Sequence, residues 1–134
     1  MVMQYVVDTH ALVWFLEGNP RLGTNAKVLL EDPTSVLIVP IIVLAEACWI
    51  IEQGRTSVPS VSNFLKAVDA DPRVTVVALD RAIFAKTLTL QTIGETHDRQ
   101  IVATALFLQD QGETVAVLTK DTNIRDAGVV TTIW

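Results

Sequence analysis

The sequence has a single cysteine, Cys48, among its 134 residues. One thiol forms no internal disulfide, and it supplies too few sulfur ligands for a cysteine-rich zinc site. Long apolar runs are also missing, although half of the residues are apolar. The longest run, Val36–Trp49, is interrupted by Pro40 and Glu46 and is shorter than the roughly 20 residues that a membrane-spanning helix needs. These absences argue against a disulfide framework, structural zinc and a membrane span.

Basic residues are in the minority, with 10 lysines and arginines against 15 acidic residues and a formal net charge of −5. A chain with this balance does not coat nucleic acid through its overall electrostatic field. A metal-dependent nuclease stays compatible with it, because bound cations neutralise the scissile phosphate locally.

The length suits one domain, and nothing in the sequence divides it. We find no internal repeat, low-complexity segment or long linker, so residues 1–134 are expected to form a single domain. Residues 1–7 lack the basic start of a secretory signal, which predicts a cytoplasmic protein. The high apolar content indicates a subunit interface.

Short apolar runs alternate with stretches of helical periodicity along the whole chain. We expect strands at about 4–7, 35–39, 74–79, 114–118 and 129–133, and helices at about 11–16, 24–30, 41–53, 61–68, 81–90, 99–109 and 121–127. Residues 74–79 are apolar almost throughout, which predicts a strand covered on both faces. The alternation predicts an α/β protein with a mainly parallel sheet and helices on both faces.

Four carboxylates stand at the ends or starts of these apolar segments, or within one of them: Asp8, Glu46, Asp98 and Asp121. Asp8 follows the first expected strand and Asp121 the fourth. Because ligands of parallel sheets bind beyond the carboxyl ends of the strands, both are expected at one edge. Several carboxylates facing one another favour a divalent cation, and their hard oxygens suit Mg²⁺ or Mn²⁺. The four acids are therefore the candidate site.

Each acid also has an ordinary structural explanation. Asp8, Asp98 and Asp121 are all placed to cap a helix, because an aspartate oxygen accepts the free amides of the first turn. Glu46 fits such an explanation least well. Its neighbours are apolar, so its helix is expected to be buried over most of its surface, and a buried glutamate needs a partner.

Polar residues beside these acids leave two interpretations open. Asn123 and Asp126 are either additional ligands or surface residues. Arg99 and Lys120 either bind phosphate or form weak surface ion pairs. The two histidines are far apart without metal-ligand spacing, which is typical of structural or exposed side chains.

Four blocks of the sequence together resemble the PIN-domain family, and most closely the VapC-type toxin ribonucleases of VapBC toxin-antitoxin systems. The blocks are VVDTHALVW, VLAEACWII, HDRQIVATAL and VLTKDTNIRD. None is specific alone, but all four occur in order on one domain-sized α/β chain. The resemblance implies that the four acids are the catalytic residues and metal ligands, with Thr9 and Thr119 in supporting positions.

The same resemblance implies a three-layer α/β/α sandwich with a mainly parallel five-stranded sheet. It also implies a Mg²⁺- or Mn²⁺-dependent endoribonuclease that hydrolyses RNA phosphodiester bonds, a homodimer and a cognate antitoxin. One alternative is a non-catalytic PIN-like scaffold that binds RNA, against which the retention of all four acids argues. A receiver-like signalling module is a second alternative, but it requires an acidic pair at the first strand, where this chain has Asp8-Thr9-His10.

Overall fold

Five parallel strands form one sheet in the structure, a computed structural model that describes residues 2–134. The strands are β1 (Met3–Val7), β2 (Val36–Pro40), β3 (Val74–Val77), β4 (Thr114–Leu118) and β5 (Thr131–Ile133). The helices are α1 (Thr9–Glu17), α2 (Thr24–Glu31), α3 (Ile41–Glu52), α4 (Val61–Ala70), α5 (Arg81–Thr87), α6 (Thr96–Asp110) and α7 (Thr122–Ala127). The order across the sheet is β3-β2-β1-β4-β5.

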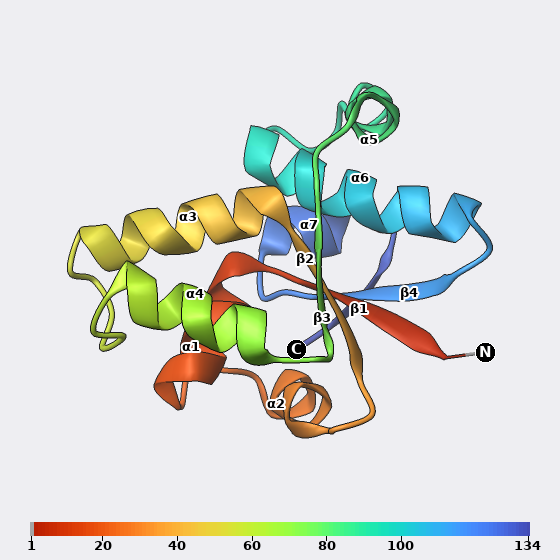
Figure 1. Cartoon of the computed structure of the whole chain (residues 1–134). Coiled ribbons are helices and arrows are strands. Elements are labelled where there is room, and N and C mark those ends of the chain that lie inside the picture. Colours follow the sequence, from red (N-terminus) through yellow and green to blue (C-terminus); the bar gives the residue numbers. More distant parts are fainter. Residues whose placement is uncertain (1) are drawn as a thin grey trace.

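Helices cover both faces of this sheet. Figure 1 shows α5, α6 and α7 above it and α1, α2 and α4 below it, while α3 begins at the carboxyl end of β2 and projects beyond the sheet. The strand order explains the two layers. The chain steps from β1 to β3 in one direction and crosses back to β4 and β5, and right-handed crossovers then place the two sets of helices on opposite faces. The predicted α/β/α sandwich with a parallel five-stranded sheet is confirmed.

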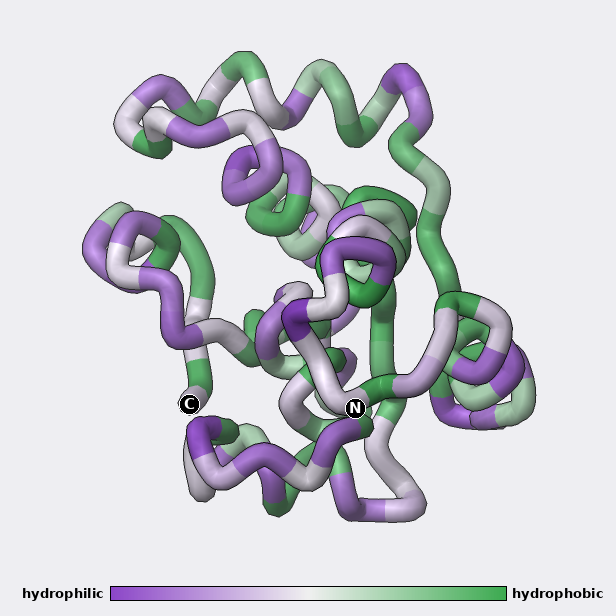
Figure 2. Tube along the Cα trace, turned by 90° about the vertical axis from the view of Figure 1, so that its left-hand side faces the viewer, coloured by the Kyte–Doolittle hydropathy of each residue, from purple (hydrophilic) through white to green (hydrophobic). Residues whose placement is uncertain are grey.

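The core lies around the three central strands, which are covered on both faces. Val6, Val39 and Val117 are completely buried there. Hydrophilic and hydrophobic residues instead alternate along the outer helices, as Figure 2 shows, because each of these helices has one face in the core and one in water. Nowhere in residues 2–134 does a helix combine the length and the apolar composition that crossing a bilayer takes.

Strand β3 differs from its prediction. It ends at Val77 rather than at residue 79, it lies at the edge of the sheet, and Thr75 and Val76 are exposed. The predicted coverage of both faces is therefore wrong, because an apolar run does not distinguish an edge strand from a central one. Helix α5 and strand β5 are also shorter than predicted, since α5 ends at Thr87 and β5 begins at Thr131.

Helix α3 is less buried than predicted. Val43, Ala47 and Ile51 form its one fully buried stripe, whereas Ile41 and Trp49 are 43% and 51% exposed. The helix packs on α1, α4 and α6 but extends past the end of the sheet, and the side that carries Ile41, Ala45 and Trp49 stays exposed. The prediction that this helix is buried over most of its surface is wrong for the single chain.

Candidate metal centre

Asp8 lies at the carboxyl end of β1, where its carboxylate is held from two sides. Its Oδ1 accepts a hydrogen bond from the backbone N–H of Thr9 at 2.6 Å, and its Oδ2 accepts one from the hydroxyl of Thr119, also at 2.6 Å. Thr119 directly follows β4, whose Leu118 is in register with Val7 of β1. Parallel pairing itself therefore brings these two residues together. Burial raises the pKa of Asp8, and the bonds from the two threonines oppose that rise.

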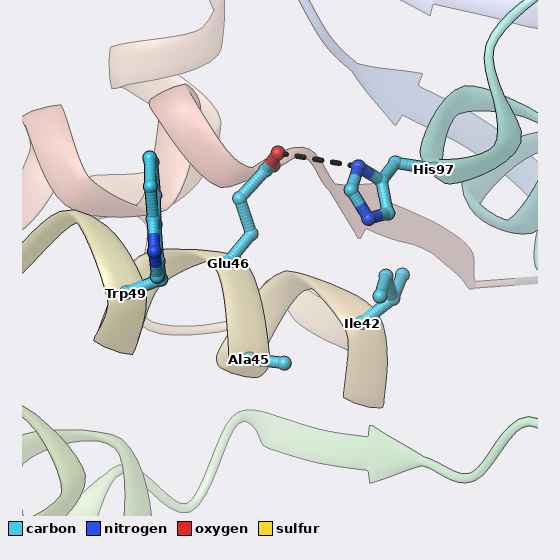
Figure 3. A pocket seen from close by; sticks show the side chains of 5 residues that line it. All are labelled: Ile42, Ala45, Glu46, Trp49 and His97. Carbon is cyan, nitrogen blue, oxygen red and sulfur yellow. Dashed lines mark ion pairs between the residues drawn. The ribbon is translucent and has the colours of Figure 1, made fainter.

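Glu46 reaches the same edge of the sheet from the exposed side of α3. The hydroxyl of Thr9 donates a short hydrogen bond to its Oε1, so Thr9 contacts both Asp8 and Glu46. On the other side, Nδ1 of His97 lies 3.6 Å from Oε2 of Glu46, and Figure 3 shows the two side chains directed toward each other. The side chain of Glu46 is 31% exposed. It is thus a half-buried acid at the rim of the site rather than an isolated buried charge.

Asp98 lies in the first turn of α6, and the prediction that it caps this helix is wrong. The helix begins at Thr96, and its N-cap is Glu95, whose carboxylate accepts a hydrogen bond from the backbone N–H of Asp98 at 3.0 Å. Burial, followed by the negative charges of Asp121, Glu95 and the two remaining acids, raises the pKa of Asp98 to about 7. Asp98 is therefore the acid that responds most clearly to the surrounding negative charge.

Asp121 caps α7 and also belongs to this edge. Its Oδ1 accepts hydrogen bonds from the backbone N–H groups of Asn123 and Ile124 at 2.8 and 3.2 Å. Its own backbone N–H donates to the hydroxyl oxygen of Thr119 at 3.0 Å. Because Thr119 also donates to Asp8, one buried hydroxyl connects the segments that carry two of the acids. Asp121 therefore caps α7 and also lies at the candidate site.

The four predicted acids thus come to one edge of the sheet, close enough for their charges to act on one another. Within residues 2–134, however, no three Asp, Glu, His or Cys side chains converge into a ready-made metal cage. Mg²⁺ commonly does without such a cage, because it binds through one or two carboxylates, several waters and the phosphate of a substrate. The donors are hard carboxylate oxygens, and a cation would offset the repulsion that raises the pKa of Asp98. The residues present therefore fit Mg²⁺ or Mn²⁺.

Of the neighbouring polar residues, some hold the local backbone in place and others are exposed. The guanidinium of Arg99 donates to the backbone carbonyl of Ile93, so Arg99 holds the loop before α6. Asn123 contributes a backbone amide to the cap of α7, and Asp126 is exposed. Lys120 is exposed too, with its ammonium 4.7 Å from the ring centroid of Trp14. Lys120 is accordingly exposed beside Asp121, with its ammonium over an aromatic ring.

The sequence did not predict Glu95 and His97 as part of this edge, because residues 95–97 lie between the helices expected at about 81–90 and 99–109. Glu95 raises the pKa of Asp98 and lies 3.3 Å from Nδ1 of His97. One signal was available. Glu95 stands three residues before Asp98, which is the spacing between an N-cap residue and the third residue of the helix that it caps.

A comparison with models of known protein families assigns the chain to a family. The family model of the PIN domain matches residues 5–130. The chain belongs to the PIN-domain family. PIN domains are generally nucleases and usually use divalent metal ions. The resemblance seen in the four sequence blocks is confirmed at the level of the family.

Two solved structures have folds similar to that of this PIN domain. One is the crystal structure of VapBC2 from Rickettsia felis bound to a DNA fragment from its promoter. Its matching chain has a TM-score of 0.70 and 16% sequence identity to this one, and the match covers 98% of each chain. FitAcB from Neisseria gonorrhoeae has a TM-score of 0.64 at 16% identity, with 98% of this chain and 97% of that chain covered. No curated protein sequence matches this PIN domain. At this identity the two likenesses concern the fold alone.

Proposed function

We propose that this PIN domain is a Mg²⁺- or Mn²⁺-dependent endoribonuclease and the toxin of a toxin-antitoxin pair. The observation that carries the proposal is the meeting of Asp8, Glu46, Asp98 and Asp121 at the carboxyl edge of the sheet, in a chain whose family consists mainly of nucleases. The likeness to VapBC2, a toxin-antitoxin complex, supports the role of a toxin. The proposal includes a cytoplasmic location.

The chain's own contribution is to hold the four carboxylates in position. Thr9 and Thr119 each use one hydrogen bond on Asp8, which leaves each carboxylate oxygen a further lone pair for a ligand. Thr9 also fixes Glu46, and the N-terminal turn of α7 fixes Asp121. A divalent cation bound there would lower the pKa of an attacking water and neutralise charge that develops on the phosphate.

The surroundings of the acids support the proposed substrate and protein partners. Lys120 stands beside Asp121, and its exposed ammonium would be available to a phosphate of RNA. The proposal includes a homodimer and a cognate antitoxin, and large exposed apolar side chains on several elements provide surface for such contacts. Metal-held phosphate explains how a chain with a net charge of −5 binds a polyanion.

Cleavage of defined RNAs tests the proposal. Purified protein is incubated with structured and unstructured RNAs in Mg²⁺, Mn²⁺ or EDTA, next to the variant Asp8→Asn and the control Asp69→Asn. Asp69 is an exposed carboxylate on α4, away from the carboxyl edge. We expect cleavage with either metal, none with EDTA, and a loss of about a thousand-fold for Asp8→Asn, because each metal ligand contributes several kcal/mol to transition-state stabilisation.

Two results would contradict the proposal. Cleavage by Asp8→Asn at the wild-type rate would remove the acids from the chemistry. RNA binding by the wild type without cleavage in either metal would favour the scaffold, the alternative that shares this fold. Asp69→Asn is expected to cut like the wild type, which ties any loss to position 8 rather than to the removal of a negative charge.

A further inference from the structure

Two grooves border the candidate metal centre, and both are lined by Glu46 and Trp49. The first, of about 370 Å³, is also lined by Ile42, Ala45 and His97 (Figure 3). The second, of about 290 Å³, lies between α1 and α3, and its lining adds His10, Arg21 and Arg55. One groove is therefore mainly apolar, whereas the other carries both basic and acidic side chains, and Trp49 lies between them.

Trp49 is half exposed, and one neighbour partly covers its ring. The guanidinium carbon of Arg55 lies 5.3 Å from the ring centroid. Because Arg55 lines the second groove and not the first, the ring remains accessible from the first groove. Figure 3 shows this ring standing upright on α3 beside Glu46. A flat aromatic surface next to small apolar side chains is what a nucleobase stacks on.

The second groove brings two guanidinium groups, those of Arg21 and Arg55, next to the carboxylates of Glu17 and Glu46. Among residues 2–134, no carboxylate lies within 4 Å of the guanidinium groups of Arg21 or Arg55. The groove's other acid, Glu17, is already engaged, since it accepts hydrogen bonds from the hydroxyl of Thr56 and the backbone N–H of Ser57, both at 2.7 Å. Guanidinium groups in this situation suit a phosphate, with which they form paired hydrogen bonds.

We propose that Trp49, Arg55 and Arg21 form a subsite for one unpaired nucleotide next to the scissile phosphate, with its base stacked on Trp49 and a flanking phosphate bound by the two arginines. The inference rests on the proposed ribonuclease function and adds the place where one nucleotide of the RNA binds. A base inside a duplex is already stacked and paired, so it reaches the Trp49 ring only at the cost of leaving the duplex. The two guanidinium groups, which have no carboxylate within 4 Å in residues 2–134, favour RNA over an apolar protein segment as the occupant.

The test separates binding from cleavage. Affinity for a fluorescent single-stranded RNA, and for a duplex of the same sequence, is measured by anisotropy in EDTA, and kcat and KM are measured in Mg²⁺. We expect Trp49→Ala to weaken single-strand binding and to raise KM about ten-fold, the size of one base-stacking contact, with little change in kcat or in duplex binding. Trp49→Phe should recover most of the affinity. Arg55→Gln should reduce the salt dependence of binding by the equivalent of about one phosphate contact.

A second arginine-aromatic pair provides the matched control. The guanidinium carbon of Arg81 lies 5.2 Å from the ring centroid of Phe84, which is exposed on α5. Arg81→Gln and Phe84→Ala therefore make the same chemical changes outside the two grooves, and we expect wild-type affinity for RNA. The molar mass of every variant is measured by light scattering, so that a change of assembly is detected separately.

Three outcomes would overturn the subsite: wild-type affinity and KM in Trp49→Ala, an equal loss in the Phe84→Ala control, or a changed molar mass of Trp49→Ala with unchanged affinity for RNA. The last would make the grooves a protein interface. If the wild type cuts RNA and Trp49→Ala cuts it with the same KM, the subsite is wrong and the ribonuclease stands. If RNA binding depends on Trp49 but no metal supports cleavage, the subsite stands and the ribonuclease is wrong.

Discussion

Carboxylates at the two ends of the parallel sheet have pKa values shifted in opposite directions. At the amino end, Arg73 contacts Asp71 through Nε at 3.1 Å and Nη2 at 2.8 Å, and it also donates to the carbonyl oxygens of Leu30 and Asp32. This arginine lowers the pKa of Asp71. At the carboxyl end, burial raises the pKa values of Asp8 and Asp98, and the negative charges of neighbouring acids raise that of Asp98 further.

The difference shows where the chain depends on something outside itself. At the amino end the fold supplies the cation, and the acid connects the segments that precede β2 and β3. At the carboxyl end, threonine hydroxyls and backbone amides orient the acids without cancelling their charge. Uncompensated charge, rather than the number of acids, therefore distinguishes the candidate site from structural ion pairs.

Removal of the cation at the amino end should have the largest effect on stability. Arg73→Met leaves Asp71 and two backbone carbonyls without their donor, and we expect the free energy of unfolding to fall by about 3 kcal/mol. The side chains of Arg73 and Asp71 are only 16% and 25% exposed, so water replaces the lost bonds poorly. Urea unfolding measures the change, and cleavage per folded molecule should stay at the wild-type level.

Arg81→Met is the matched control for that substitution. Arg81 is exposed, and within the described chain no carboxylate lies within 4 Å of it. Its loss should change stability by less than about 0.5 kcal/mol. An Arg73→Met protein as stable as this control would mean that the ion pair does not stabilise the amino end. The amino end would then no longer differ from the carboxyl end in this respect.

Thr119→Val should produce the next largest effect, this time on cleavage. The substitution keeps the shape of a buried side chain but removes the donor to Asp8 and the acceptor for the backbone N–H of Asp121. Residues that orient metal ligands typically contribute 10- to 100-fold to metal affinity or activity, so we expect a loss of about that size. Titration with Mn²⁺ and the cleavage rate in saturating Mg²⁺ distinguish weaker metal binding from slower chemistry.

Two further variants define what the Thr119 result means. Thr119→Ser retains the hydroxyl and should recover most of the activity. Thr104→Val removes another buried hydroxyl, one that donates to the carbonyl of Gln100 within α6, and it should leave cleavage close to wild type. Equal losses in Thr119→Val and Thr104→Val would show that Thr119 contributes general stability and not the orientation of the acids.

The sequence predicted the shared location of Asp8 and Asp121 because that location follows from topology. Both residues come after strands of a parallel sheet, and such strands end at one edge. The parallel sheet with helices on both faces followed from the alternation of elements, the family resemblance implied the three-layer sandwich, and the structure confirms both. That the four acids bind metal stays a prediction, which the cleavage experiment tests.

Contacts between distant side chains were beyond sequence reasoning. The hydroxyl of Thr9 reaches Glu46, which is 37 positions away, only because α1 and α3 pack together at the edge of the sheet. Apolar composition predicted a buried α3, but composition does not reveal that this helix extends past the sheet and exposes Trp49. Helix α6 began earlier than predicted because the side chain of Glu95 replaces Asp98 as its cap.

The last expected effect is the dependence of stability on pH, because the two ends titrate in opposite directions over different ranges of pH. The pKa of Asp98 is raised from 3.8 to about 7, so between those values the folded chain binds more protons than the unfolded chain, and this group's contribution to stability falls as pH rises. Asp71 has a lowered pKa, and its contribution is lost as pH falls below about 4.

Urea unfolding in EDTA at several pH values separates the two slopes. Relative to the wild type, Asp98→Asn should gain stability as pH rises from about 4 to about 7, because it has no carboxylate to ionise there. Asp71→Asn should be less stable than the wild type at neutral pH and should approach it in acid. Parallel curves for Asp98→Asn and the wild type would show that Asp98 ionises normally, and the carboxyl end would then lack the uncompensated charge that sets it apart from the amino end.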